Sequence, residues 1–326
     1  MGNTSFIRHR RPRYAEFSRK LVKETQLSAE NLVYPIFVQE EEGDTALSML
    51  PGISRYGGKA LINHVKEAHA RGIPLVSLFP VVNQALKTET CNEAFSSDNL
   101  ICRTIKDLKN AIPEIGLMAD VALDPYNPNG QDGFVDTDGT VANDPTVEAL
   151  VKQSKVLADA GADVLGPSDM MDGRIGLIRE MLEHEGHHRT ILLSYAAKYA
   201  SALYGPFRNA VGSSNSLVGD KKSYQMDPAN RMEAIREIRT DLEEGADWVM
   251  IKPGHTYLDI ITECKSTFGV PTFAYHVSGE YAMWAFAAQH GVIDRKKSLM
   301  EILLSFRRAG CDGILSYAAF EAADIL

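Results

Sequence analysis

Two lysines follow short apolar runs that have the composition of buried strands. Lys198 ends the sequence SYAAK, and Lys252 lies in IKPG, where Pro253 restricts the lysine to an extended backbone and Gly254 permits a sharp turn. If the two runs are neighbouring strands, about 5 Å apart, both amines reach one pocket and each disfavours the charge of the other. A lysine amine that becomes neutral attacks ketones and forms a Schiff base. The pair therefore predicts Schiff-base chemistry, although a single lysine at such a position is more simply explained by an ion pair or by a side chain that extends to solvent.

Residues 197–224, which begin beside Lys198, have the composition of a lid over a pocket. The segment is rich in Ser, Gly and Asn, and the cations of Arg208, Lys221 and Lys222 suit a substrate carboxylate. A solvated loop is the alternative. We also expect a dry wall that keeps the amine of Lys198 neutral, formed by Tyr195, Tyr199, Tyr204 and Phe207.

Five aspartates fall within residues 120–138, among prolines and glycines. Close carboxylates on such a loop can bind a hard cation, raise the pKa of one another for proton transfer, or hold a substrate ammonium group. The preference of aspartate for turns explains Asp136 and Asp138, but it does not explain Asp120 and Asp124 at the end of an apolar run. The spacing does not match a calcium-binding D-x-[DN]-x-[DN]-G loop.

The elements that must position these residues follow a repeated order of helix, glycine and apolar run. The four clearest repeats are 64–79, 153–168, 237–254 and 304–318, and further strands are expected at 33–38, 117–121, 191–195 and 271–276. Helices are expected at 59–71, 99–110, 144–160, 174–186, 227–244, 257–267, 280–290 and 297–309. Eight such units, with no GxGxxG motif, predict one (β/α)₈ TIM barrel over 31–326, with its chemistry at the C-terminal ends of the strands.

Composition limits the remaining possibilities. The chain has 326 residues, a net charge of −9 and four scattered cysteines, which we interpret as reduced thiols in a cytoplasmic protein that does not enter membranes. Seven Lys or Arg residues and one acid fall in the first 23 residues. A basic arm over residues 1–30 can bind nucleic acid, target the chain or dock on another copy of the acidic body, and we favour docking because no basic groove occurs elsewhere.

Several motifs together resemble porphobilinogen synthase, the 5-aminolevulinate dehydratase family. They occur in the family's order from about Arg11 to the C-terminus, as ADVALDPYNPNGQDG, GPSDMMDGR, SYAAKYASALYGPFR, SYQMDPAN, MIKPG, YHVSGEY and LSYAA. The resemblance implies a (β/α)₈ barrel with an N-terminal arm, assembled as a homo-octamer. It implies condensation of two molecules of 5-aminolevulinic acid to porphobilinogen with loss of two waters, an early step of tetrapyrrole biosynthesis.

The resemblance also assigns roles to residues. Lys252 would form the Schiff base on the propionate side of the product and Lys198 the one on the acetate side. The acetate-side carboxylate would be held by Arg208, Lys221 and Gln225, and the propionate-side carboxylate by Ser278 and Tyr317. Tyr195 and Phe207 would line the pocket, while Asp120, Asp124 and Asp132 would position an amino group or move protons.

The metal ligands of this family vary in the aspartate segment. Zinc-dependent members have three cysteines there, whereas this chain has Ala122, Asp124 and Asp132, which excludes a catalytic Cys₃ zinc site and favours Mg²⁺ or a monovalent ion at Asp124 and Asp132. Asn129 stands where the family leads us to expect a histidine. The resemblance places the chain in the magnesium-responsive branch, with Glu237 as ligand of an allosteric Mg²⁺ and with an outer shell formed by Asp169 and Arg174.

Two alternatives remain open at the level of the sequence. A class I aldolase also uses a Schiff-base lysine in a barrel, but it needs only one. A non-catalytic relative that kept the barrel for binding or assembly has no use for two intact lysines.

Overall fold

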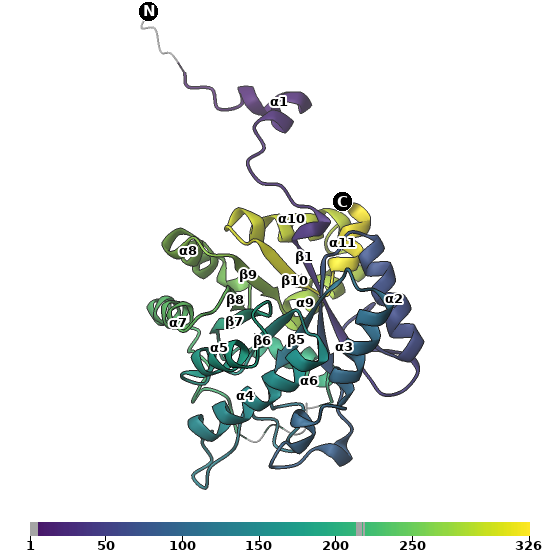
Figure 1. The fold of residues 1–326 in the computed structure, drawn as a ribbon. Helices are drawn as coiled ribbons and strands as arrows, with labels where there is room; N and C mark the ends of the chain where they lie inside the picture. Colours follow the sequence, from purple (N-terminus) through teal and green to yellow (C-terminus); the bar gives the residue numbers. More distant parts are fainter. Residues whose placement is uncertain (1–5, 213–216, 218) are drawn as a thin grey trace, which may run out of the picture.

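The computed structural model describes residues 6–212, 217 and 219–326, and its centre is a closed barrel of eight parallel strands (Figure 1). The barrel strands are β1 (Leu32–Val38), β4 (Leu75–Pro80), β5 (Gly116–Val121), β6 (Val164–Pro167), β7 (Ile191–Lys198), β8 (Trp248–Lys252), β9 (Thr272–His276) and β10 (Gly313–Ser316). Pairing of Leu32 with Ile314 and of Val33 with Leu315 closes the ring between β1 and β10. The predicted (β/α)₈ barrel is confirmed.

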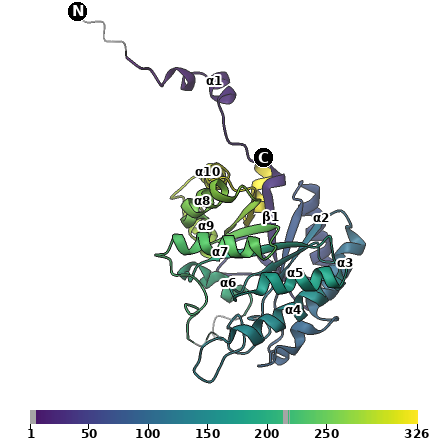
Figure 2. The same cartoon turned by 60° about the vertical axis from the view of Figure 1, so that its left-hand side comes forward.

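Helices surround the barrel in both views (Figures 1 and 2). They are α2 (Gly58–Ala70), α3 (Leu100–Ala111), α4 (Asn143–Ala160), α5 (Arg174–His184), α7 (Met232–Glu243), α8 (Leu258–Phe268), α9 (Ser278–Gln289), α10 (Arg295–Arg308) and α11 (Ala319–Ile325). The predicted helix 227–244 starts too early, because the carboxylate of Asp227 accepts the N–H of Ala229 at 2.8 Å in an Asx turn, and α7 begins only at Met232. Short 3₁₀ helices occur at η1 (Arg11–Arg13), η2 (Ala29–Asn31), η3 (Gln84–Leu86), η4 (Asn92–Phe95), η5 (Ala202–Tyr204) and η6 (His255–Tyr257).

A hairpin outside the barrel was not expected from the sequence. Strand β2 (Gly43–Ala46) pairs antiparallel with β3 (Ser54–Gly57), and β3 pairs with the last residues of β1, Phe37 with Arg55 and Val38 with Tyr56. Because Phe37 and Val38 end β1, the hairpin lies at the C-terminal rim of the barrel, where the candidate chemistry is expected.

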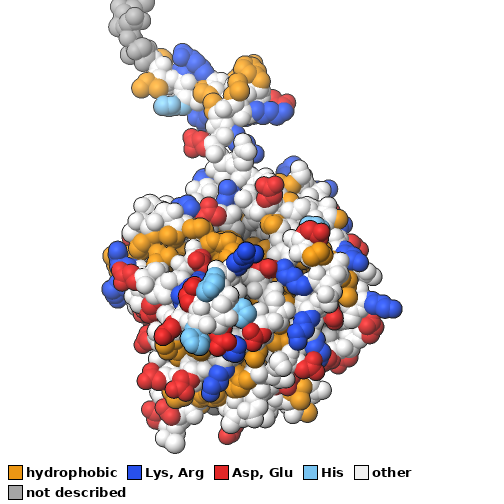
Figure 3. Space-filling view, viewed as in Figure 1, with side chains coloured by type: hydrophobic (Ala, Val, Ile, Leu, Met, Phe, Trp, Pro, Cys, Tyr) orange, Lys and Arg blue, Asp and Glu red, His pale blue; other side chains and the backbone are white. Residues whose placement is uncertain are grey.

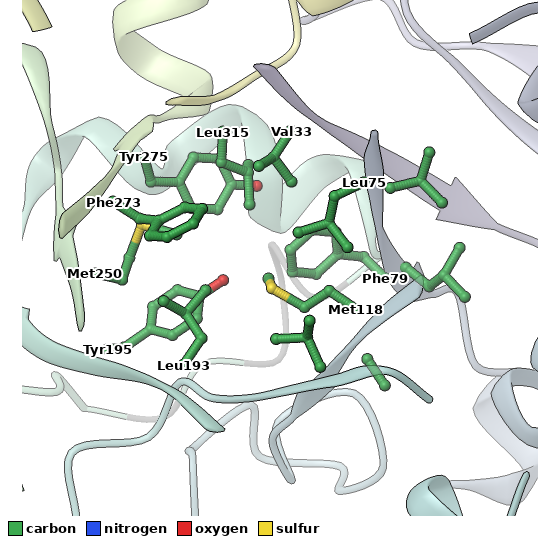
Figure 4. Packing of buried hydrophobic residues seen from close by; sticks show 14 of the residues in the cluster. Val33, Leu75, Phe79, Met118, Leu193, Tyr195, Met250, Phe273, Tyr275 and Leu315 are labelled. Atoms are coloured by element: carbon green, nitrogen blue, oxygen red, sulfur yellow. The ribbon is translucent and has the colours of Figure 1, made fainter. Parts of the chain in front are cut away.

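Apolar side chains fill the interior of the barrel. The residues labelled in Figure 4 come from all around the ring and are all buried: Val33, Leu75, Phe79, Met118, Leu193, Tyr195, Met250, Phe273, Tyr275 and Leu315. Strands that are buried on both faces read as continuous apolar runs, which explains the sequence pattern. Because apolar side chains fill the interior, the charged residues of the barrel strands lie at the C-terminal ends of the strands.

The first residues form an arm that extends away from the barrel (Figures 1 and 2). It contains η1 and α1 (Glu16–Leu21), and it joins the barrel through η2 at the end where β1 begins. Large apolar side chains on the arm are exposed, among them Ile7 at 83% and Tyr14 at 91%. Among the described residues, no helix is long and apolar enough to cross a membrane.

Candidate active site

The two lysines are aligned partners on adjacent strands. Lys198 ends β7, Lys252 ends β8, and the two residues pair directly in the sheet register. Strand β7 was expected to end at Tyr195 but continues to Lys198, with a register shift relative to β8 between Ser194 and Ala197. Both lysine side chains are buried, with 5% and 8% exposed. The structure therefore brings both amines to one site, as predicted.

The lysines line a cavity of about 360 Å³ at the C-terminal end of the barrel. Most of the residues expected in the site share this cavity: Asp120, Asp124, Asp132, Lys198, Phe207, Arg208, Lys221, Gln225, Lys252, Ser278 and Tyr317. Part of the predicted lid, residues 213–216 and 218, lies outside the described residues. Its remainder includes η5 and α6 (Gly205–Ala210), so the segment is partly helical.

Aromatic rings surround Lys252. Its Nζ lies 4.7 Å from the ring centroid of Tyr275, 5.1 Å from Tyr195, 5.3 Å from Tyr204 and 5.5 Å from Phe207. Burial, and then the neighbouring ammonium of Lys198, lower the pKa of Lys252 to about 7. A substantial fraction of Lys252 is therefore neutral near pH 7, and the amine is a competent nucleophile.

The expectation that these rings enclose Lys198 is wrong. Three of them face Lys252 instead, and Tyr199 points elsewhere: its hydroxyl donates to the carbonyl of Asn230 at 3.0 Å, and its ring stacks on Tyr257. Successive residues of an extended chain point to opposite sides, so Tyr199 cannot share the side of Lys198.

Lys198 occupies a polar environment. Its Nζ donates to Oδ2 of Asp132 at 3.2 Å and to the carbonyl oxygen of Ser168. The two lysines therefore differ in their surroundings: aromatic rings enclose Lys252, whereas Lys198 is hydrogen-bonded to a carboxylate and to a carbonyl oxygen.

Asp132 of the aspartate loop is bonded to three side chains of the site. Its carboxylate accepts hydrogen bonds from Lys221 at 2.8 Å and from Gln225 at 3.2 Å, besides that from Lys198. Burial alone would raise the pKa of Asp132, but Lys198 and Lys221 outweigh burial and lower the pKa to about 2. Asp132 is thus the buried carboxylate that Lys198 and Lys221 share.

The other two acids of the cavity, Asp120 and Asp124, are half-buried and less well paired. Burial raises the pKa of Asp120 to about 7, although Lys252 acts against the increase, and Oδ1 of Asp120 has no hydrogen-bond partner among the described residues. Burial also raises the pKa of Asp124, against the opposing effect of Lys221 at 3.9 Å. Asp120 is therefore able to gain or lose a proton near pH 7, beside Lys252.

The hydroxyl groups expected to hold a carboxylate are also in place. Oγ of Ser278 accepts the N–H of Phe207 at 3.0 Å, and the hydroxyl groups of Tyr317 and Tyr275 lie 2.8 Å apart. Ser278 is the first residue of α9, and the N–H groups at a helix N-terminus favour an anion.

Two residues that the sequence reasoning missed hold the loops of the site. Glu280 is buried, and its carboxylate accepts the N–H groups of Thr256 and Val277 at 2.9 Å each, which ties the loop after Lys252 to α9. Its position three residues after Val277 in YHVSGEY is the spacing of a capping box, a signal that could have identified it. The second residue is Arg55, on the unexpected hairpin.

The expected magnesium ligand lies outside the cavity, on α7. Glu237 is half-buried, and its pKa is raised first by burial and then by Asp241. Arg174 pairs with Asp241 at 3.1 Å and lies 3.5 Å from Asp169, which is fully buried. Within the part of the chain that the structure describes, no three His, Cys, Asp or Glu side chains are grouped as a metal site. The four cysteines are free and buried.

Comparisons with known proteins identify the family. A family model described as delta-aminolevulinic acid dehydratase matches residues 6–325. The chain belongs to the delta-aminolevulinic acid dehydratase family. A dehydratase of this name from Rhodobacter capsulatus is 51% identical over 324 residues, covering 98% of this chain and 96% of the relative. A chloroplastic dehydratase from Glycine max is 48% identical, covering 98% of this chain and 78% of the relative.

A solved structure agrees with these relatives. The delta-aminolevulinic acid dehydratase of Toxoplasma gondii ME49, in complex with the reaction product porphobilinogen, superposes with a TM-score of 0.97 at 47% identity, covering 99% of this chain and 92% of the other. The chain is therefore a lyase that condenses 5-aminolevulinic acid to porphobilinogen, as the sequence motifs led us to expect. A class I aldolase and a non-catalytic relative are set aside.

Proposed function

We propose that Lys252 and Lys198 trap the keto groups of two 5-aminolevulinic acid molecules, in that order. The observation that carries the proposal is the unequal environment of the aligned lysines, aromatic around Lys252 and ionic around Lys198. Lys252 attacks the first ketone because its amine is available near pH 7. The carbinolamine then loses water, and a C=N bond replaces the C=O bond.

The three aspartates of the cavity have different roles in the proposed reaction. Asp120 exchanges protons with the reacting groups, because its pKa of about 7 matches that of Lys252. Asp132 keeps Lys198 and Lys221 in place as their shared anion. Asp124 lines the same cavity and is suited to hold a substrate ammonium group. Since Lys198 and Lys221 both pair with Asp132, and Lys221 also lies 3.9 Å from Asp124, charge balance at these acids does not require a resident metal ion.

The two carboxylates of the substrates bind at different elements. Arg208 from α6, with Lys221 and Gln225, binds the carboxylate on the acetate side, because cationic and amide donors gather there. Ser278 and Tyr317 bind the propionate-side carboxylate, supported by the N-terminus of α9.

Borohydride trapping tests the order of capture. The wild-type enzyme is mixed with substoichiometric 5-aminolevulinic acid and reduced with borohydride. Peptide mass spectrometry is then expected to show the adduct on Lys252. An adduct on Lys198 alone would reverse the proposed order, and no adduct on either lysine would refute the scheme.

We propose a magnesium response through Glu237, in line with the magnesium-responsive branch. Mg²⁺ keeps several waters and needs only one or two carboxylates, so a half-buried acid on α7 suffices as protein ligand, with Arg174 and Asp169 behind it. Glu237→Ala is expected to abolish stimulation by Mg²⁺ and to keep basal activity. The control is Glu233→Ala on the same helix, which should retain the stimulation in a magnesium titration. Unchanged stimulation in Glu237→Ala would contradict the assignment.

We propose that the arm docks on the barrel of a second copy within a homo-octamer. Tyr14 and Phe17 of the arm are exposed. Apolar and basic side chains lie close together on the arm in Figure 3, and the arm extends away from the barrel of its own chain in Figures 1 and 2. A chain that starts at residue 29 should sediment as a smaller assembly, and an unchanged octamer would refute the docking role.

We also propose that the protein is located in the cytoplasm, which cell fractionation tests.

A further inference from the structure

Helix α6 carries Phe207 and Arg208 into the cavity, yet it has only six residues. A helix of this length does not persist in water by itself, because nucleation costs more than so few hydrogen bonds return. Its end groups also lack partners within the helix. The position of Arg208 therefore depends on what holds α6 from outside.

The N-terminal part of α6 is held by α9. Ser278 accepts the N–H of Phe207 and donates to the carbonyl of Leu203 at 3.3 Å. A Cβ atom on Gly279 would lie only 2.5 Å from that carbonyl oxygen, so the backbone before α6 packs directly on α9.

The C-terminal part of α6 is held by Arg55 of β3. Its Nε donates to the carbonyl of Ala210 at 2.8 Å, and its Nη2 donates to the carbonyl of Asn209 at 3.3 Å. These are the last two residues of the helix, where carbonyl groups lack partners within the helix and carry partial negative charge; the carbonyl of Asn209 also accepts the N–H of Gly212 at 3.2 Å. Arg55 forms no ion pair with any other described residue and is not among the residues that line the cavity. Among the described residues, the guanidinium group of Arg55 therefore bonds only to the end of α6.

We propose that Arg55 is a positioning residue for the second substrate: by binding the last two carbonyls of α6, it keeps Arg208 directed into the cavity. The inference rests on the proposed role of Arg208 as a carboxylate ligand. It also gives a function to the hairpin β2–β3, which places Arg55 at the rim through the pairing of Arg55 with Phe37 of β1. Arginine suits the task because one planar fork reaches two carbonyls, whereas lysine presents a single ammonium group.

Steady-state kinetics and hydrogen exchange test the proposal. Arg55→Ala is expected to raise the KM for 5-aminolevulinic acid about tenfold and to lower kcat/KM by 10- to 100-fold, because a small misplacement of a binding group has effects of this order. Amide exchange in α6 should accelerate, while borohydride capture of the first substrate at Lys252 should stay at the wild-type rate. Arg55→Lys should recover part of the loss.

The matched control is Arg103→Ala, which removes a half-exposed arginine that binds Glu40 and, among the described residues, forms no hydrogen bond or ion pair with α6. This variant should keep the wild-type KM. In a double-mutant cycle, Arg55→Ala should add little to Arg208→Ala if both act through one contact with the substrate.

Three outcomes would overturn the role of Arg55. One is an unchanged KM in Arg55→Ala beside a raised KM in Arg208→Ala, which leaves the proposed function intact. Another is a loss of capture at Lys252 that accompanies the rise in KM, which indicates general damage to the fold. An unchanged KM in Arg208→Ala itself would instead overturn the proposed role of Arg208, and the role of Arg55 with it.

Discussion

Replacement of Lys252 by alanine is expected to lower turnover on the order of 10⁴-fold, because it removes the amine that begins the covalent route. The borohydride-stable adduct should disappear with it. Lys198 is not expected to capture the first substrate in its place, since its Nζ is hydrogen-bonded to Asp132 and to the carbonyl of Ser168 until the first substrate is bound. Activity and adduct formation in Lys252→Ala, compared with the wild-type enzyme by mass spectrometry, measure both effects.

Lys198→Ala is the matched variant for this experiment. It should also lose turnover, because the second substrate is no longer captured, but the adduct on Lys252 should persist. An adduct on Lys198 that forms at the wild-type rate in Lys252→Ala would show that the difference in environment does not set the order.

The capture rate should also follow the charge of Lys252. The neutral fraction of an amine grows as pH rises through its pKa, so capture should increase through about pH 7 and fall nearly tenfold for each unit below it. Asp120 titrates in the same range, and the observed midpoint therefore belongs to the pair. Because the anion of Asp120 raises the pKa of Lys252, Asp120→Asn should move the midpoint to lower pH. A midpoint near the ordinary lysine value would contradict burial as the controlling factor.

The pairing of the lysines could be predicted from the sequence because it depends on strand order. Two apolar runs at consecutive positions of a parallel barrel must be neighbours, and their ends must meet at one rim. Which lysine the rings surround could not be predicted in this way. The register shift between Ser194 and Ala197 changes how the end of β7 faces the barrel, and no periodic pattern signals a shift of this kind.

The contacts that hold α6 and the loop after Lys252 could not be predicted from the sequence, for a different reason. Arg55 binds backbone carbonyls of residues more than 150 positions away, and backbone groups leave no trace in the sequence of the partner. Its hairpin has strands of four residues, which are too short for alternation to be recognised. Glu280 carried a local capping pattern, but only the structure shows that the same carboxylate also binds the loop after Lys252.

Asp132→Asn is expected to destabilise the protein and to impair catalysis together. The substitution keeps the shape of the side chain but removes the negative charge shared by Lys198, 5% exposed, and Lys221. Loss of one partner from a buried ion pair costs about 3 to 5 kcal/mol, because the remaining charge stays buried without compensation. We expect a loss of free energy of unfolding near the lower value, measured by urea denaturation, and a fall in kcat/KM on the order of 100-fold.

Asp136→Asn is the control, because Asp136 lies on the same loop and is exposed. This variant should change neither the free energy of unfolding nor kcat/KM. Wild-type stability in Asp132→Asn would show that the two ammonium groups do not depend on the shared carboxylate.

The pH dependence of stability separates the charge of Asp132 from its packing. The pKa of Asp132 is lowered from 3.8 to about 2 in the folded protein, so its ionised form stabilises the fold above about pH 4, and this contribution disappears as pH falls toward 2. The shift corresponds to about 2 kcal/mol. Asp120 and Asp169 have raised pKa values, about 7 and about 6, and therefore titrate above this window with the opposite sign. Wild-type and Asp132→Asn stabilities should consequently converge between pH 4 and 2, whereas a difference that stays constant over this range would assign the effect to packing.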